Sequence, residues 1–325
     1  MAGLIDTIIA ELKKSAETSF IHTPTYHHIR GDKYYSSYIE NLFCGSLSEF
    51  HKSSFGEAQG GELLPKGDRP AKMSAIRSSS ALAVNIFGND SHVQIIDNQI
   101  DLPNGKFDLK YEEAEGQTII QDANDEKNPH YANIDVRLTN ADEAEIFIEV
   151  KMLEPLSFTP KLNEAYANPN NYNPMLGSKL IDAFVKIFER YNAWAKDKSN
   201  KKNPAHCFDA CQMFKHLLAI LDLSMKGKLK SKNVILVNCH WNFEAFPKSK
   251  IQSKRVLKTF ERKCDQYKAS KKEYCENIEL LKKLILDAGI LDNLTIVNCS
   301  HTEIIDGLDI TPKHRKYLER YSITQ

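Results

Sequence analysis

Hydrophobic residues recur along this chain with two different spacings, and each spacing predicts a different element. Alternating or continuous apolar runs predict strands over 93–96, 107–113, 133–139, 145–151, 233–241 and 294–300. Apolar residues three or four positions apart predict helices over 4–12, 76–87, 179–194, 207–223, 250–270 and 274–288, with a last helical piece after Pro312. The elements therefore alternate in type, and no segment repeats.

The strands predicted over 133–139 and 145–151 are separated by the short polar segment NADEA, which favours an antiparallel hairpin. The two helices predicted over 179–194 and 207–223 are expected to lie on the sheet that this hairpin joins. The order of elements predicts an α/β (α+β mixed) fold, with a central mixed sheet flanked by helices.

The N-terminal part has a less regular pattern. A Tyr- and His-rich stretch over 26–43 is expected to be helical in its second half, and the Gly- and Pro-rich run over 55–70 is expected to be largely irregular. We therefore expect residues 1–73 to form a helical and irregular segment packed on the core, and residues 74–325 to form the main domain, with a basic helical C-terminal part.

Composition limits the class of protein. With 325 residues, 42% of them hydrophobic and 26% charged, the chain falls in the soluble globular class. Seven cysteines form no CxxC pair and follow no apolar leader, which favours reduced thiols and a cytoplasmic location. No run approaches the roughly 18 apolar residues of a membrane span, so no membrane association is expected.

The net charge of zero conceals two oppositely charged segments. Residues 107–149 hold twelve acidic and three basic residues, a balance of −9, whereas residues 226–272 hold fourteen basic and three acidic residues, a balance of +11. A basic segment is typical of a surface that faces phosphates, and clustered carboxylates can hold a metal ion that acts on them. A solvated basic face is the simpler alternative for the lysines of 226–232.

Two charged residues interrupt the apolar strand AEIFIEVKMLEP. Glu149 and Lys151 lie two positions apart, so they point to the same face of the strand. Pairing across the hairpin can bring Asp135 to the same face, although the sequence alone does not fix the register. Mg²⁺ prefers oxygen ligands and often takes one or two carboxylates, so Asp135 and Glu149, with the Val150 carbonyl, are candidate ligands. Lys151 would then orient or deprotonate an attacking water and offset charge in the transition state.

Other chemistries lack their minimal motifs. The chain contains no GxGxxG after a strand, no GxxxxGK[ST], no HExxH and no GxSxG. Cys207, Cys211 and His206 are close in sequence, but two thiols spaced four apart on a predicted helix are more typical of buried cysteines than of a zinc site.

The spacing of Asp135 from Glu149-Val150-Lys151 resembles the signature of the PD-(D/E)XK nuclease superfamily. The segments SSSALAVNIFG, ANIDVRL, IEVKMLEP and CQMFKHLLAI resemble blocks of its bacterial restriction-endonuclease-like members, and together these blocks span roughly half of the chain. The residue before the aspartate is Ile134, where the family pattern has proline. The resemblance implies hydrolysis of DNA phosphodiesters with Mg²⁺, or with Mn²⁺ as a substitute, with Asp135 and Glu149 as metal ligands and Lys151 as the catalytic lysine.

Further site residues follow from the same resemblance. Such nucleases often add an acidic residue from an early helix, for which Glu62 is the first candidate here, with Glu57 and Glu112 behind it; an ordinary loop residue in solvent is the alternative for Glu62. Gln212 matches a polar residue, on the helix after the catalytic strand, that contacts phosphate or steadies the site; a satisfied polar pair with His216 beside the core is the alternative. Residues that could contact nucleic acid lie beside Gln212 or in the basic segment; they are Lys215, His216, Lys254, Arg255 and Lys258.

The sequence thus predicts a Mg²⁺-dependent DNA endonuclease of the restriction type that acts on double-stranded DNA, and two cuts on a duplex would suggest a homodimer. A repair or phage-processing nuclease of the same fold is an alternative, and so is a module that binds nucleic acid without cutting it.

Overall fold

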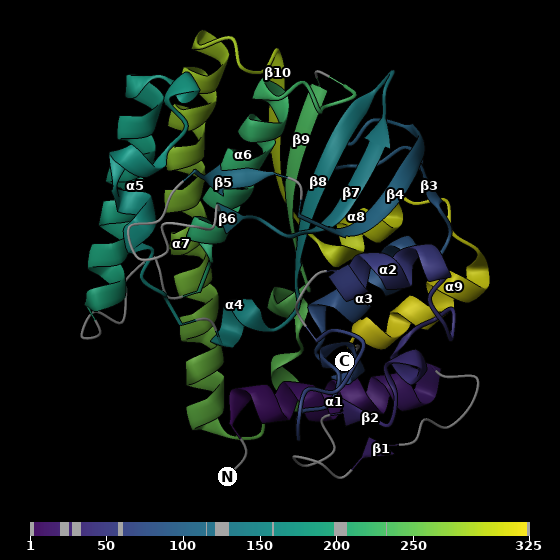
Figure 1. Cartoon of the computed structure of the whole chain (residues 1–325). Coiled ribbons are helices and arrows are strands. Elements are labelled where there is room, and N and C mark those ends of the chain that lie inside the picture. The colour runs from purple at the N-terminus through teal and green to yellow at the C-terminus, as the bar shows by residue number, and fades with distance from the viewer. Residues whose placement is uncertain are drawn as a thin grey trace.

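Six strands form one mixed sheet at the centre of the computed structural model, which describes residues 3–19, 26–27, 34–57, 61–114, 116–120, 130–157, 159–197, 207–231 and 233–323 (Figure 1). Their order across the sheet is β10-β9-β8-β7-β4-β3. The strands are β3 (His92–Ile95), β4 (Gly105–Glu113), β7 (Ile134–Asn140), β8 (Ala144–Lys151), β9 (Asn233–His240) and β10 (Asn293–Ser300). Two small ladders lie outside this sheet, one of β1 (Tyr26–His27) with β2 (Tyr34–Tyr35), and one of β5 (Gln117–Ile119) with β6 (His130–Tyr131).

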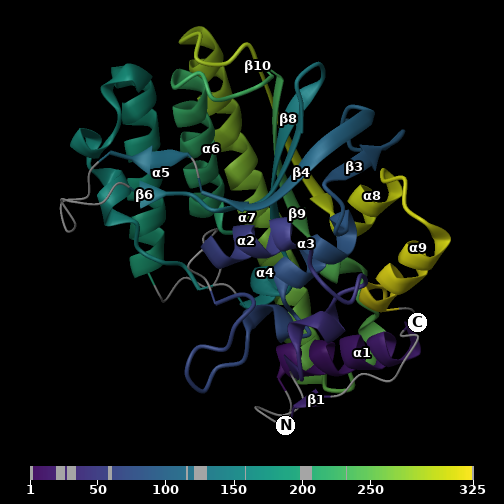
Figure 2. The ribbon, with the colours of Figure 1, turned by 45° about the vertical axis from the view of Figure 1, so that its right-hand side comes forward.

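Helices cover both faces of the sheet, as Figures 1 and 2 show. The helices are α1 (Leu4–Ser19), α2 (Glu49–Glu57), α3 (Ser79–Phe87), α4 (Glu154–Ser157), α5 (Ser178–Lys196), α6 (Ala210–Met225), α7 (Lys254–Asp287), α8 (His301–Asp306) and α9 (Pro312–Leu318). Helices α6 and α7 lie on one side, and α2, α3 and α8 on the other. The fold class expected from the sequence is confirmed: a mixed sheet flanked by helices, consistent with a restriction-endonuclease-like fold.

Strand β8 lies inside the sheet, between β9 and β7. All its residues except Lys151 are buried, because β7 and β9 pair with its two edges and helices cover its two faces. The β7–β8 pairing is antiparallel, as expected from the short turn, where Asp142 N–H donates to Asn140 Oδ1 over 3.0 Å. The β8–β9 pairing is parallel. The carboxyl ends of β8 and β9 therefore lie at the same edge of the sheet.

A buried network of ion pairs connects three neighbouring strands of the sheet, β4, β7 and β8. Arg137 of β7 donates from Nε to Glu145 Oε2 of β8 over 2.9 Å, and from Nη1 to Glu113 Oε2 of β4 over 2.8 Å. The same guanidinium lies over the Phe147 ring, 5.2 Å from its centroid. Removing one partner of such a buried network typically costs about 3–5 kcal/mol, because the other charges stay buried. The network therefore holds the hairpin in one register.

The C-terminal segment completes both the sheet and the core. Strand β10 pairs in parallel with β9 along all eight of its residues. Arg320 is buried, donates to Asn41 Oδ1 over 2.9 Å and contacts the hydroxyls of Tyr35 and Tyr317. Trp241 Nε1 donates to the Tyr321 carbonyl over 2.7 Å. The end of the chain thus joins the N-terminal segment to the sheet.

The predicted strands agree with the observed ones to within two residues at their ends, but three helical predictions were wrong. Helix α5 lies outside α6 rather than on the sheet: Phe188 and Tyr191 pack against Phe214 of α6, with ring centroids 6.2 and 6.0 Å apart. The two helices expected over 250–270 and 274–288 are one helix, α7, since residues 270–274 contain neither glycine nor proline. Its buried stripe continues through Tyr267 and Tyr274.

The third wrong prediction concerns the stretch 26–43, of which residues 28–33 lie outside the described part of the chain. Its second half forms β2 and a 3-10 turn (Tyr38–Asn41) instead of an α-helix. The turn ends where the Asn41 side chain donates to the carbonyls of Met73 and Ala75, both over 2.8 Å. In the run expected to be irregular over 55–70, α2 continues to Glu57, and residues 58–60 lie outside the described part of the chain.

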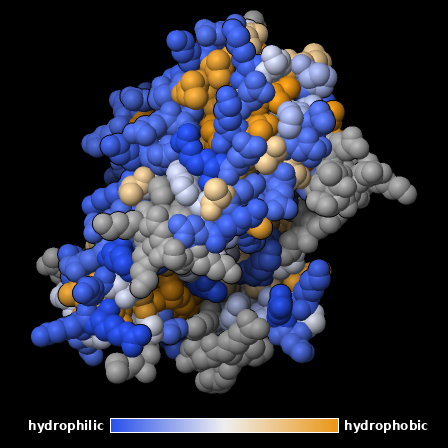
Figure 3. All heavy atoms as spheres, turned by 90° about the vertical axis from the view of Figure 1, so that its left-hand side faces the viewer, coloured by the Kyte–Doolittle hydropathy of each residue, from blue (hydrophilic) through white to orange (hydrophobic). Residues whose placement is uncertain are grey.

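The core and the surface agree with the composition. One buried hydrophobic cluster extends from Leu4 to Tyr321. The division of the chain into an N-terminal segment, residues 1–73, and a main domain, residues 74–325, stays a prediction. The face formed by α5 and α7 is largely hydrophilic, with smaller hydrophobic patches (Figure 3). Among the described helices, none combines the length and the apolar character that a bilayer crossing requires.

Candidate active site

Asp135 and Glu149 are brought together by the β7–β8 hairpin. Val136 pairs with Ile148, and the same register continued by one residue sets Asp135 opposite Glu149. Directly opposed residues of an antiparallel pair share a sheet face. Beside this pair a side chain takes the place of a backbone carbonyl as acceptor: Val150 N–H donates to Asp135 Oδ2 over 2.7 Å. The Val150 carbonyl points to the same edge of β8 as its N–H, and therefore toward Asp135.

Glu149 is buried and accepts hydrogen bonds from three side chains. Gln212 Nε2 donates to its Oε1 over 2.7 Å, and His216 Nε2 lies 2.7 Å from its Oε2. Lys151 Nζ contacts Oε1 in an ion pair. Burial by itself would raise the pKa of Glu149, but the charges of Lys151 and His216 outweigh it and lower the pKa to about 2. The carboxylate is therefore ionised and held in one orientation by α6.

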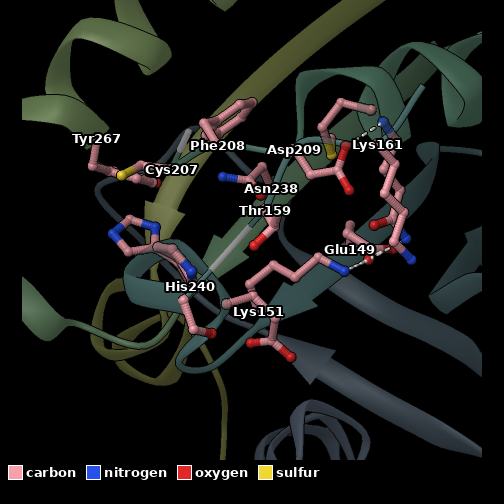
Figure 4. Close-up of a pocket in the computed structure, with 15 residues that line it drawn as sticks. Glu149, Lys151, Thr159, Lys161, Cys207, Phe208, Asp209, Asn238, His240 and Tyr267 are labelled. Atoms are coloured by element: carbon pink, nitrogen blue, oxygen red, sulfur yellow. Dashed lines mark hydrogen bonds and ion pairs between the residues drawn. The ribbon is translucent and has the colours of Figure 1, made fainter. Parts of the chain in front are cut away.

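Lys151 is the last residue of β8 and is partly exposed, with 19% of its side chain accessible. Burial opposes its charge, yet the carboxylates of Glu149 and Asp135 raise its pKa above the usual value. The ammonium therefore keeps its proton near neutral pH. Figure 4 shows the side chain extending along the cavity floor toward Glu149.

Additional carboxylates surround Asp135. Glu112 of β4 stands between Tyr111 and Glu113, which pair with Val136 and Ile134, so its backbone lies alongside Asp135. Its φ of 51° is rare for a residue other than glycine. Burial, followed by the charges of Glu62 and Glu149, raises the pKa of Glu112 to about 8.

The same surplus of negative charge acts on Asp135. Burial raises the pKa of Asp135 well above its usual value, and the charges of Glu149 and Glu112 raise it further. A bound cation would relieve this repulsion, so the charge distribution favours a positive ligand between these carboxylates.

The donor set fits Mg²⁺ rather than a metal that needs an all-protein cage. Among the described residues, no group of three or more His, Cys, Asp or Glu side chains is arranged around a common metal position. Mg²⁺ does not require one, because it usually binds one or two carboxylates and completes its shell with water and substrate phosphate. Asp135, Glu149 and the Val150 carbonyl match that need.

A cavity of about 340 Å³ opens beside Glu149 and Lys151, between the ends of β8 and β9 and the helices α4, α6 and α7 (Figure 4). Ligands of open α/β sheets commonly bind at the carboxyl ends of parallel strands. The lining residues come from five segments; they are Glu149, Lys151, Glu154, Pro155, Ser157, Thr159, Lys161, Cys207, Phe208, Asp209, Gln212, Met213, Asn238, His240 and Tyr267.

Among the other predicted residues, Gln212 lies in the site, and His216 lies behind Glu149 rather than on an exposed surface. Lys215 points elsewhere: its Nζ lies over the Tyr166 ring, 4.8 Å from the centroid. Glu62 is buried instead of solvent-exposed, and it accepts from Lys72 Nζ over 2.9 Å and from Ser80 Oγ over 3.0 Å.

The predicted basic residues Lys254, Arg255 and Lys258 are exposed in the first turns of α7. Thirteen residues separate Lys254 from Tyr267 of the cavity wall, which is about 20 Å along a helix at 1.5 Å per residue. They lie to one side of the cavity. Cys207 is buried beside Gln266 and Lys263, and His206 lies outside the described residues.

Sequence reasoning assigned no role to Asn238, which pairs with Glu149, or to His240, which pairs with Lys151. The signal was present, because both are polar residues two positions apart in an otherwise apolar strand, as Glu149 and Lys151 are. It also did not single out Glu154, whose Oε2 accepts from Met152 N–H over 2.7 Å and whose charge acts on Lys151.

Comparison with known proteins places this geometry in a family. A family model described as "Restriction Endonuclease associating with ARP" matches residues 10–291, which include the hairpin, α6 and the whole cavity lining. No curated protein and no solved structure matches the chain.

Proposed function

This chain belongs to the restriction endonuclease family described as associating with ARP, and on that premise we propose that it is a Mg²⁺-dependent endonuclease of double-stranded DNA. The proposal assigns the PD-(D/E)XK roles to Asp135, Glu149 and Lys151. The observation that carries it is the convergence of two carboxylates and an ammonium at the end of β8, beside an open cavity.

Asp135, Glu149 and the Val150 carbonyl are the groups that would hold Mg²⁺. When bound, the ion would supply positive charge to the phosphate oxygens and lower the cost of bringing anionic DNA to an acidic site. Gln212 and His216 fix the orientation of Glu149, so that its carboxylate is set before substrate arrives.

Lys151 acts on the reacting phosphate. Its proposed role is to orient or deprotonate the attacking water and to stabilise the negative charge that grows on phosphate oxygens. The burial of Glu149 beneath it restricts the directions in which the ammonium can point.

The first turns of α7 are the proposed contact with flanking DNA. Lys254, Arg255 and Lys258 are exposed and carry three positive charges. Lys254 and Lys258 lie about 20 and about 14 Å along the helix from Tyr267 of the cavity wall, which corresponds to about six and about four base pairs at 3.4 Å per pair. They would therefore bind phosphates outside the cleaved step and add affinity without reading sequence.

A plasmid-cleavage assay tests the function. The full chain is incubated with supercoiled plasmid in Mg²⁺, in Mn²⁺ and in EDTA, and we expect nicked or linear product only with a divalent cation. Lys151→Ala should remove the product, whereas Lys283→Ala, at an exposed position in the last turns of α7, should not. Absence of product under all conditions, with DNA binding intact, would favour the binding module instead. Sequencing the ends of the product separates a restriction enzyme from a repair or phage-processing nuclease, and a homodimer should cut both strands in one encounter.

A further inference from the structure

Three polar atoms in the wall of the cavity make no hydrogen bond of normal geometry with the described residues. They are Asn238 Nδ2, His240 Nδ1 and Tyr267 Oη, all of them buried, and the side chains of Asn238 and Tyr267 lie near each other. A buried polar group without a hydrogen-bond partner destabilises the structure, so a ligand that supplies the partner is favoured. Asn238 and His240 pair with Glu149 and Lys151, so all four side chains project from one face of the sheet.

The three groups offer both donors and acceptors. Burial lowers the pKa of His240 to about 4, and the charge of Lys271 adds to the effect, so the imidazole is neutral near pH 7 and its Nδ1 can donate or accept. Burial raises the pKa of Tyr267, which keeps its hydroxyl protonated, and Asn238 lies close enough to oppose that rise. The Asn238 amide adds a donor.

The remaining walls are aromatic and apolar. Phe208 precedes α6 and packs against Tyr267 with ring centroids 5.9 Å apart, and Met213 lies one turn into α6. The rim is open, because Ser157, Thr159 and Lys161 are exposed. Figure 4 shows Phe208 and Asn238 on the wall across from Lys151. A volume of about 340 Å³ lies at the small end of the range for ligand sites.

The geometry points to a binding site for one unpaired nucleobase of DNA, seated next to the phosphate on which Glu149 and Lys151 act. A nucleobase has a flat face that stacks on aromatic rings and an edge of donors and acceptors that matches the unpartnered groups. This inference rests on the proposed function for the identity of the ligand. The base could be extruded from a duplex or belong to a strand that is already unpaired. In both cases it presents the same flat face and the same hydrogen-bonding edge to the cavity.

Fluorescence-anisotropy titrations of the full chain in EDTA test the site without cleavage. Three labelled probes of equal length are compared: a fully paired duplex, the same duplex with one mispaired base, and a single strand. A base that is already unpaired avoids the free-energy cost of unpairing, so we expect at least one unpaired probe to bind about ten-fold tighter than the paired duplex. A gain with the mispaired duplex indicates extrusion, and a gain with the single strand alone indicates a base from an unpaired strand.

Two variants connect this preference to the cavity. Thr159→Trp places a large ring at the exposed rim, and Asn238→Leu removes the amide with little change in volume. Both should reduce the preference, which is the ratio of the affinity for the unpaired probe to the affinity for the paired duplex, to about one-fold. Asn170→Trp, at an exposed position away from the cavity, is the matched control and should retain the preference. Thermal melting verifies folding, and Thr159→Trp stands alone if Asn238→Leu does not fold.

Equal affinity for all three probes, or a preference that survives Thr159→Trp, would overturn the site. Such a result together with Mg²⁺-dependent cleavage of plasmid removes the nucleobase site and leaves the nuclease proposal intact. Conversely, a preference that depends on Thr159 and Asn238 without any cleavage supports the site and removes the nuclease proposal.

Discussion

His216 Nε2 lies 2.7 Å from Glu149 Oε2 across the interface between α6 and β8, and both side chains are buried. Because the carboxylate is ionised, the imidazole is the donor. The sequence pattern had grouped His216 with residues that contact nucleic acid. Its place behind Glu149 makes it a positioning residue for the proposed metal ligand.

His216→Ala should reduce plasmid cleavage by about 10- to 100-fold and raise the Mg²⁺ concentration needed for half-maximal rate, as loss of a supporting hydrogen bond does at other metal sites. The acid limb of the pH–rate profile should move to higher pH, because His216 contributes to the low pKa of Glu149 and its removal raises that pKa. His92→Ala, at an exposed histidine, is the control. An unchanged Mg²⁺ requirement would show that His216 does not position Glu149.

Lys151→Ala should lower the cleavage rate by about 10²- to 10³-fold, as does removal of a group that stabilises transition-state charge. Binding of the paired duplex should change by less than ten-fold, because a single phosphate contact is lost. Single-turnover rates and anisotropy titrations measure the two quantities. A variant that lost affinity and rate in equal proportion would place Lys151 in binding rather than in catalysis.

Asp135→Asn should remove cleavage and at the same time increase stability without metal. Asp135 is buried beside Glu149 and Glu112, so its charge is repelled, whereas an asparagine oxygen can still accept from Val150 N–H. The gain should be about 1 kcal/mol, or about 2 °C in Tm for a domain of this size. Asp108→Asn, at an exposed position, should change neither property. A fall in Tm for Asp135→Asn would contradict the charge argument.

Mg²⁺ should stabilise the wild-type chain and not the variants Asp135→Asn or Glu149→Gln. A ten-fold excess of ligand over its Kd adds about 1.4 kcal/mol, which thermal melting detects. Lys151→Ala should retain or strengthen the response, because the ion and Lys151 compete for Glu149. Equal Mg²⁺ responses in the wild type and both carboxylate variants would mean that the ion binds elsewhere.

Protonation of His301 should lower the free energy of unfolding below about pH 6.5, which is the ordinary pKa of a histidine in an unfolded chain. Burial, followed by the charge of His240, lowers the pKa of His301 to about 3 in the folded state. Its neutral form therefore stabilises the fold above pH 6.5, and that stability is lost as pH falls toward 3. At pH 5 the loss from this group is about 2 kcal/mol.

Urea unfolding at pH 7.5, 6.5 and 5 measures this dependence. Asp135 and Glu112 act in the opposite direction, because carboxyls with raised pKa are stabilised when they take up protons. The contribution of His301 is therefore the difference between the wild type and His301→Gln, which should lose less stability on acidification. Parallel curves for the two proteins would exclude His301 as the source.

Replacing Lys254, Arg255 and Lys258 by alanine should weaken DNA binding and reduce the slope of log K against log salt by up to about 2.7, at 0.9 per phosphate contact. The matched control replaces Lys272, Lys282 and Lys283 in the C-terminal half of the same helix, α7. The control should keep the wild-type slope. If both triple variants behave alike, the whole helix acts as a diffuse charge and not as a DNA contact.

The hairpin was predictable because its signal is local. The turn over 140–144 is short, and the strands on either side are apolar, so few registers remain; the structure selects the one in which Asp135 lies opposite Glu149. The cavity was not predictable, because its walls come from segments whose relative placement depends on tertiary packing. Asn238 faces Glu149 only because β9 joins β8 in parallel.

Glu112 illustrates a different limit. Its left-handed backbone departs from regular strand geometry, and nothing in the segment FDLKYEE announces that departure. The polar residues 270–273 (SKKE) interrupt the spacing of the apolar stripe of α7, so the sequence predicts two helices where the structure has one. The buried Tyr267 and Tyr274 continue that stripe when seen against α6.

Strand β10 lies beyond residue 291, where the family match ends, and it covers the outer edge of β9. A gene fragment trimmed to the matched region would leave β9 with a row of unpaired N–H and C=O groups, an open template for other chains. Such a fragment should precipitate or form strand-swapped aggregates during expression, so recombinant work on this protein should retain the chain through Tyr321.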